Sequence, residues 1–108
     1  MTQQPDPFFQ PVSAMELARF AGVPTFMRLP ELSPDHARFS DVDLGIVGVP
    51  WDGGTTNRPG ARHGPRQLRD LSTMIRAMNP VTGVAPFASV NCADMGDVPP
   101  NPVDIQEA

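Results

Sequence analysis

The chain has 108 residues, of which 40% are hydrophobic, so its length suits one small domain without guaranteeing a self-sufficient core. Its 14 prolines and 9 glycines predict long irregular connections and few regular elements. The formal net charge of −4 disfavours a nucleic-acid-binding protein, which needs a basic face, and no apolar stretch approaches the roughly 18 residues of a membrane-spanning helix.

Two residue types narrow the chemistry further. The sequence contains no lysine, which excludes a Schiff-base lysine, a lysine general base and a P-loop lysine. The single cysteine, Cys92, permits no internal disulfide, and the first residues lack the basic start and apolar run of a secretory signal. We therefore expect a cytoplasmic protein.

The first elements along the chain are an arm and a short helix. Residues 1–12 are polar and interrupted by proline, and we expect a flexible arm in which Phe8 and Phe9 anchor against something else. Ser13 lies three residues before Glu16, the spacing of a capping box, and predicts a helix of about two turns that ends before Gly22 and Pro24.

A strand, a helix and a second strand follow. The apolar run Val42–Val49 predicts a strand buried on both faces of a parallel sheet, with glycines that permit close approach of a helix or another backbone. Pro65 suits a first helical position, and the apolar residues after it recur at helical spacing until Asn79 and Pro80: Leu68, Leu71, Ile75 and Met78.

The second strand is predicted within residues 87–98, where Ala88, Val90 and Cys92 alternate with more polar positions. A helix is predicted to begin near Asp104, which is placed to act as an N-cap or first-turn acid. The order strand, helix, strand predicts the α/β class with parallel pairing. Because so small a sheet is marginal in water, we expect these residues to be the N-terminal part of a larger protein.

The loop between the first strand and the helix is the candidate site. Residues 49–71 hold four glycines, three prolines and four arginines. Ligands of open parallel sheets bind beyond the carboxyl ends of the strands, and this loop leaves such an end. Asn57, Arg58 and Arg62 are candidates for orienting a carboxylate or carbonyl. The alternative is a loop whose shape is set by turn residues and which is held by salt bridges at an interface. A phosphate-binding loop is disfavoured, because the segment contains neither of the two glycine-rich phosphate-binding motifs.

Other polar residues carry weaker signals. The candidate metal ligands His36, His63, Cys92, Asp94 and Asp97 have no recognised spacing. We interpret the two aspartates as ending a strand and holding a turn, His63 as a helix-entry or interface residue, and Cys92 as a small hydrophobe. Trp51 lines the site or caps the core. Arg66, in the first helical turn, calls for a carboxylate from another segment or subunit, or for solvent.

Three segments carry a resemblance to a known family. They read FAGVPTFMRLP, GVPWDGGTTNRPGARHGPRQLR and ADMGDVPPNPVD, and they resemble the N-terminal third of agmatinase-like ureohydrolases of the arginase superfamily. The resemblance runs from about Phe20 to Asp104, and the middle segment is long enough to be highly specific. The form with Trp51, Asp52, the two following glycines and His63 is closer to guanidino-acid hydrolases such as guanidinopropionase or guanidinobutyrase than to arginase itself.

The resemblance implies a three-layer α/β/α fold with a largely parallel eight-stranded sheet. Residues 13–108 then form an incomplete N-terminal portion of a single domain, contributing the first strand, the following helix and an edge strand. It also implies two metal ions, usually manganese but also nickel or another divalent metal, which generate a hydroxide that attacks a guanidinium carbon and releases urea. A homo-oligomer, trimeric or hexameric, is implied as well.

The family's metal ligands come from G-G-D-H, D-A-H-x-D and D-x-D segments that lie further along the chain. No catalytic or metal-binding residue is therefore assigned here, and we expect the chain alone to be inactive and to bind no metal. The candidate residues of the loop, at the substrate entrance or at a subunit interface, share that one segment: Trp51, Asp52, Asn57, Arg58, Arg62 and His63.

Two functions remain open. The first is a fragment of a metal-dependent hydrolase of agmatine, a guanidino acid or guanidine. The Arg-rich loop favours an anionic substrate tail, because Arg58 or Arg62 can pair with a carboxylate in bidentate fashion. The second is a non-catalytic truncated paralogue that binds a full-length subunit through its loop and arm.

Overall fold

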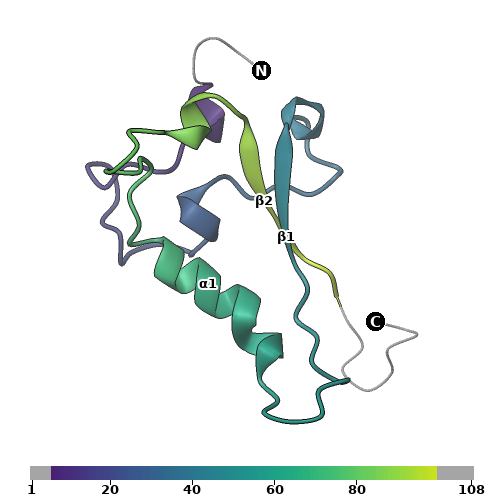
Figure 1. The fold of residues 1–108 in the computed structure, drawn as a ribbon. Coiled ribbons are helices and arrows are strands. Elements are labelled where there is room, and N and C mark those ends of the chain that lie inside the picture. Colours follow the sequence, from purple (N-terminus) through teal and green to yellow (C-terminus); the bar gives the residue numbers. More distant parts are fainter. Residues whose placement is uncertain (1–5, 100–108) are drawn as a thin grey trace.

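The computed structural model describes residues 6–99 and contains a strand–helix–strand unit within long irregular connections. Strand β1 (Leu44–Gly48) and strand β2 (Cys92–Asp97) lie side by side, and helix α1 (Gly64–Ser72) lies beside them (Figure 1). Single turns of 3₁₀ helix interrupt the connections at Pro7–Phe9, Phe26–Arg28, Phe39–Asp41, Ala61–His63 and Pro86–Ala88.

The two strands are parallel, which confirms the predicted β-α-β order and the α/β class. Leu44 pairs with Cys92 and Ile46 with Asp94, but Gly48 pairs with Asp97. Two steps along β1 thus face three along β2, which is the signature of a β-bulge.

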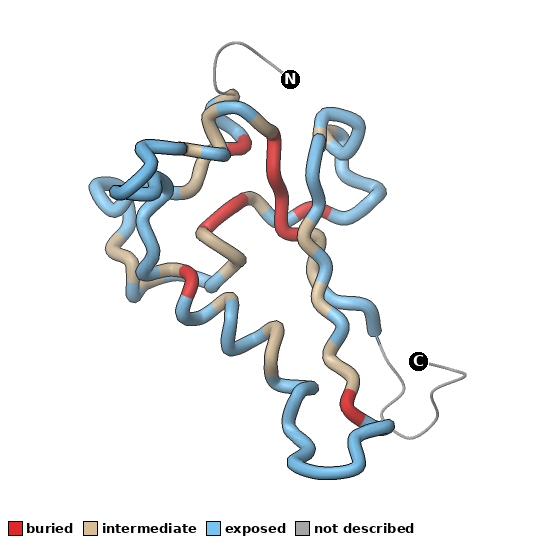
Figure 2. Tube along the Cα trace, in the orientation of Figure 1, coloured by how far each residue is buried: buried red, intermediate tan, exposed pale blue. Residues whose placement is uncertain are grey.

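The other side of β2 is bonded to residues 30–32. The Asp94 amide donates to the Pro30 carbonyl at 2.9 Å, and the Leu32 amide donates to the Asp94 carbonyl at 3.1 Å. Many of the buried residues accordingly lie in the first half of β2 and in residues 28–32, which run beside it (Figure 2). The central cluster is small and consists of Phe9, Leu32 and Ala93, with Val42 and Met95 packed against it.

The N-terminal segment is anchored within its own chain. The Phe9 side chain is fully buried in the central cluster. It therefore anchors the segment against the core of its own chain, where the sequence predicted a contact with something else. Phe8 lies edge-on to Phe9, with ring centroids 5.0 Å apart. The flexibility predicted for residues 1–12 stays a prediction.

The helix predicted to begin at Ser13 is wrong beyond its first turn. The amides of Glu16 and Leu17 both donate to the Ser13 carbonyl at 3.0 Å, and the Ser13 hydroxyl accepts from the Met15 amide at 3.1 Å. The turn does not continue, and Met15 is 94% exposed. Short helices depend on packing for their stability, and this segment buries little of its surface.

The helix after Pro65 and both strands are shorter than predicted. Helix α1 ends at Ser72 instead of continuing to Met78. The Ser72 hydroxyl accepts from the Met27 amide at 2.8 Å and donates to the Arg69 carbonyl at 2.8 Å, so a contact from another segment marks the end of the helix. The helix predicted near Asp104 lies outside the described residues.

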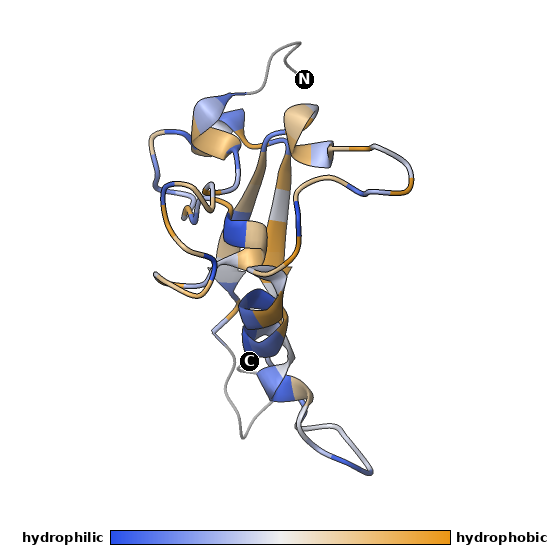
Figure 3. Cartoon of the chain, turned by 90° about the vertical axis from the view of Figure 1, so that its left-hand side faces the viewer, coloured by the Kyte–Doolittle hydropathy of each residue, from blue (hydrophilic) through white to orange (hydrophobic). Residues whose placement is uncertain are grey.

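Much of the predicted buried surface is exposed in this chain. In the apolar segment 42–49, which contains β1, the exposed fraction is 50% for Leu44, 52% for Val47 and 61% for Val49. The apolar side chains of α1 are similarly exposed. Figure 3 shows hydrophobic residues along β1 and at the start of β2, and hydrophilic ones along much of α1. Among residues 6–99, no helix has the length and apolar character needed to cross a membrane.

Candidate functional site

The loop of residues 49–63 runs from the carboxyl end of β1 to the start of α1 and projects beyond both (Figure 1). It carries all six predicted site residues. Asp52 is buried and Trp51 half-buried, whereas the other four predicted residues are exposed: Asn57, Arg58, Arg62 and His63.

Asp52 closes the loop on itself. One carboxylate oxygen accepts from the Gly60 amide at 2.7 Å and from the Arg62 amide at 3.3 Å, and the other accepts from the Arg62 Nε at 2.8 Å. The Arg62 guanidinium also pairs with Asp52 at 2.8 Å through Nη2. The hydrogen bond from Arg62 lowers the pKa of Asp52 from 3.8 to about 2. Asp52 is therefore an ionised brace of the loop.

The arginines of this segment differ in whether they form an ion pair. Arg62 is held by Asp52, whereas the ion pairs among residues 6–99 include neither Arg58 nor Arg66. Arg58 adopts a positive φ of 57°, a conformation uncommon for a side chain other than glycine or asparagine, and it is exposed. Within residues 6–99, the exposed loop arginine outside any ion pair is thus Arg58.

Trp51 packs over Gly53 of its own loop. A Cβ atom at Gly53 would lie 2.4 Å from the Trp51 ring, so only glycine fits beneath the indole. Trp51 is not a member of the central hydrophobic cluster of the described residues. Trp51 therefore does not cap that cluster, and its predicted role in lining the site stays a prediction.

A network of charged side chains joins α1 to β2 and was not predicted from the sequence. Arg69 of α1 donates from Nε to Asp94 at 2.8 Å and from Nη2 to the other Asp94 oxygen at 3.1 Å. It also donates to the Gly96 carbonyl at 2.9 Å and to Asp97 at 2.7 Å. The available signal was strand alternation, because Asp94 lies two residues after the buried Cys92 and so shares its face.

Asp94 is the most enclosed carboxylate of the described residues, with 1% exposure. Besides Arg69, it accepts from the Phe26 amide at 2.8 Å and the Gly96 amide at 2.9 Å. Burial raises the pKa of Asp94, but these hydrogen bonds outweigh burial and leave the pKa below its usual value. The predicted strand-ending role is therefore corrected: Asp94 lies inside β2 and joins three segments.

Cys92 behaves as the small hydrophobe that its position predicts. It is a free thiol, 5% exposed, and burial followed by the nearby Asp43 charge raises its pKa. A thiol with a raised pKa is protonated at neutral pH and is a poor nucleophile.

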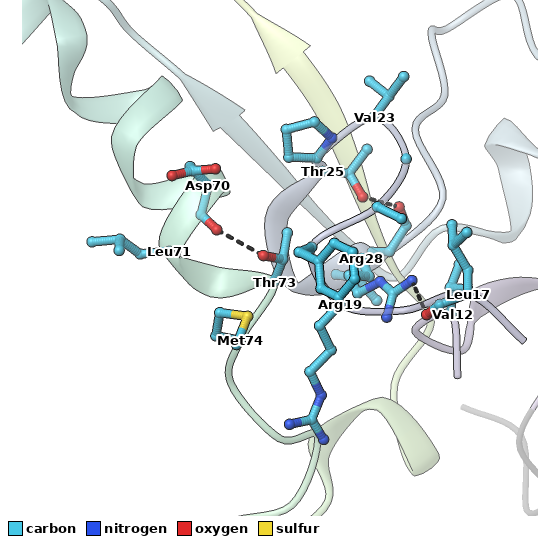
Figure 4. Close-up of a pocket in the computed structure, with 15 residues that line it drawn as sticks. Val12, Leu17, Arg19, Val23, Thr25, Arg28, Asp70, Leu71, Thr73 and Met74 are labelled. Atoms are coloured by element: carbon cyan, nitrogen blue, oxygen red, sulfur yellow. Dashed lines mark hydrogen bonds between the residues drawn. The ribbon is translucent and has the colours of Figure 1, made fainter. Parts of the chain in front are cut away.

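A pocket of about 440 Å³ lies away from the loop, between residues 12–29 and the end of α1 (Figure 4). Arg28 lines it, is 9% exposed and donates to the Leu17 carbonyl at 2.7 Å. Arg28 thereby satisfies the carbonyls at the end of the short N-terminal turn. We assign the pocket no chemistry.

The described residues do not fit a metal centre. Within residues 6–99, no group of three or more His, Cys, Asp or Glu side chains is placed to hold an ion. Asp41 and Asp43 match the D-x-D spacing, but Asp41 pairs with Arg38 at 2.7 Å and Asp43 accepts from the Asn91 amide at 3.0 Å. Asp94 is committed to Arg69.

Comparison with known proteins places the chain in a family. The Arginase family model matches residues 42–108. The chain is 50% identical to guanidinopropionase and 48% identical to guanidinobutyrase, both of Pseudomonas aeruginosa, over 92% of its own length in each case. It spans only 30% and 31% of the lengths of these two relatives.

The structure agrees with the sequence comparison. A solved structure of proclavaminate amidinohydrolase from Streptomyces clavuligerus superposes with a TM-score of 0.72 and 40% identity, covering 82% of this chain and 28% of that one. The matched region includes the loop and the strand–helix–strand unit that carries it. This chain belongs to the arginase family and forms an N-terminal portion of its α/β fold.

Proposed function

We propose that the chain is part of a hydrolase that cleaves a guanidino compound to urea and an amine. The observation that carries the proposal is the family match over residues 42–108 together with relatives named for guanidino substrates. The remaining length of those relatives, about 70%, has no counterpart in this chain, so the activity belongs to the complete protein.

The proposed enzyme uses two divalent metal ions, manganese first among them, to supply an activated water. Because residues 6–99 offer no fitting ligand set, these ions are proposed to bind elsewhere in the complete protein, and this chain alone is proposed to be inactive. The contribution of the described residues is structural: they build the first part of the sheet and shape the loop at its carboxyl edge.

The loop is proposed to form the rim of the substrate entrance or a subunit contact in a homo-oligomer. Its position beyond the end of β1 supports the first role, since ligands of parallel sheets bind at that edge. Arg58 is the candidate partner for an anionic substrate tail, because the Arg62 guanidinium is held by Asp52. The location proposed for the enzyme is the cytoplasm.

The test is urea release by the complete protein encoded by the gene, purified and supplied with manganese. Agmatine, guanidinopropionate, guanidinobutyrate and guanidine would be compared at equal concentrations. We expect turnover of at least one guanidino acid and loss of turnover after chelation. No urea from any of the four would contradict the proposed reaction, and efficient turnover of agmatine alone would contradict the anionic tail.

The alternative function, a non-catalytic module that binds a full-length subunit, is compatible with the exposure of the apolar faces, as is the catalytic fragment. The central cluster holds three buried residues, while several apolar side chains of β1 and α1 are half-exposed. A partner that covers these faces would stabilise the chain in either case, so the two functions are separated by the urea assay and by the melt described below.

A further inference from the structure

We propose that Arg69 is a positioning residue that sets the shape of the carboxyl end of β2. The inference rests on the proposed function, because that end of the sheet is where a ligand of this fold would bind. The pairing between the two strands is irregular, and the bulge falls at Met95 and Gly96.

The bulge is held by two side chains, Asp94 within β2 and Arg69 from α1. Gly96 has a φ of 79°, which favours glycine, and its amide donates to Asp94 at 2.9 Å. Arg69 bonds the Gly96 carbonyl at 2.9 Å, so both polar backbone groups of the bulged residue are satisfied by one ion pair. Bulges redirect the side chains that follow them and occur frequently beside active sites.

Arg69 also holds the residue that the bulge redirects. Its Nη1 donates to Asp97 at 2.7 Å, while Nε and Nη2 grip Asp94. The fork of a guanidinium can hold these two carboxylates and the carbonyl at once, whereas the single ammonium of lysine cannot reproduce that geometry.

Beyond the bulge, the chain returns to β1. The Val98 amide donates to the Gly48 carbonyl at 2.9 Å, which directs the backbone that leaves the sheet. Four contacts from one arginine therefore define where the segment after β2 begins. An error in the placement of that segment would be carried to whatever the complete protein builds at this edge.

Amide exchange on the complete protein distinguishes local positioning from general stabilisation. In Arg69→Lys, we expect faster exchange at Val98 and unchanged exchange at Leu44, whose amide bonds to Asn91 at 3.1 Å at the opposite end of β1. A second variant, Gly96→Ala, disturbs the same bulge through its positive φ, because an added Cβ would meet only Glu31, at 3.9 Å. Arg66→Lys, three positions earlier on α1, is the control.

Turnover supplies the second measurement. Both variants are expected to lower kcat by about tenfold to a hundredfold, as small misplacements do, with a smaller change in KM at a temperature where they remain folded. Equal changes in exchange at Val98 and Leu44, no change at either amide, or wild-type turnover in both folded variants would overturn the inference. If the unaltered protein releases no urea, the proposed function fails, and the exchange measurement alone decides the role of Arg69.

Discussion

Asp52 and Arg62, ten residues apart, form an ion pair at 2.8 Å that closes the loop between β1 and α1. The Asp52 side chain is 1% exposed and the Arg62 side chain 47% exposed, so the carboxylate lies inside the loop and the guanidinium covers it. The Gly60 and Arg62 amides complete the contact. A loop rich in glycine and proline thereby acquires a defined shape without a regular element.

Asp52→Asn should open this loop. The neutral amide cannot form the ion pair, and its nitrogen is a donor that cannot accept the backbone N–H groups. We expect faster tryptic cleavage after Arg62, followed by mass spectrometry of the fragments. Asp70→Asn, at an exposed position on α1, is the matched control. Equal cleavage rates in the two variants would contradict the bracing role.

The same pair predicts how stability depends on pH. The pKa of Asp52 in the folded protein is about 2, below the usual 3.8, so its contribution is present above about pH 4 and is lost as pH falls toward 2. Urea unfolding of the complete protein at several pH values across this window should show that Asp52→Asn loses less stability on acidification than the unaltered protein. Parallel curves for the two proteins would disprove this coupling.

Removal of Arg69, the ion-pair partner of the buried Asp94, should lower the free energy of unfolding. Arg69→Met leaves an enclosed carboxylate with two backbone donors and no counter-charge, and breaking a buried pair in this way costs about 3–5 kcal/mol. The free energy of unfolding of the complete protein is measured by denaturant titration. Arg66→Met, on an exposed part of the same helix, should change it by less than about 0.5 kcal/mol. A similar small effect for both would mean that the ion pair contributes little.

Asp97 and Pro65 leave no room for a side chain at Gly48. A Cβ atom there would lie 2.1 Å from an Asp97 carboxylate oxygen and 2.8 Å from the Pro65 Cβ. We expect Gly48→Ala to cost about 1–3 kcal/mol, as overpacking does. Gly54→Ala is the control, because nothing lies within 4 Å of the added atom. Equal thermal midpoints for the two variants of the complete protein would show that the strand and helix can separate at no cost.

The isolated 108-residue chain should melt without a sharp transition. Its central cluster is small and its apolar strand and helix faces are half-exposed, so little cooperative burial opposes the chain entropy. Circular dichroism during heating measures this. A sharp, reversible transition would favour the autonomous binding module over the catalytic fragment.

Local sequence determined the order of elements and the family. The apolar run of Val42–Val49 and the proline and apolar spacing after Gly64 depend on neighbouring residues, so strand, helix and parallel strand could be predicted from them. The specific loop motif led to the arginase family, which the comparisons then confirmed. Element ends were less predictable, because packing decides whether a turn of helix continues.

Tertiary structure decided which charges meet. Nothing in the spacing of Arg69 and Asp94, or of Asp52 and Arg62, reveals a pair, since each contact requires the chain to return on itself. Local sequence pattern accordingly suggested Arg62 as a partner for an outside carboxylate and Asp94 as the end of a strand. Composition and local pattern specified the α/β unit; the folded chain alone determined that Asp52 holds the loop and that Arg69 holds the bulge, because both depend on distances through space.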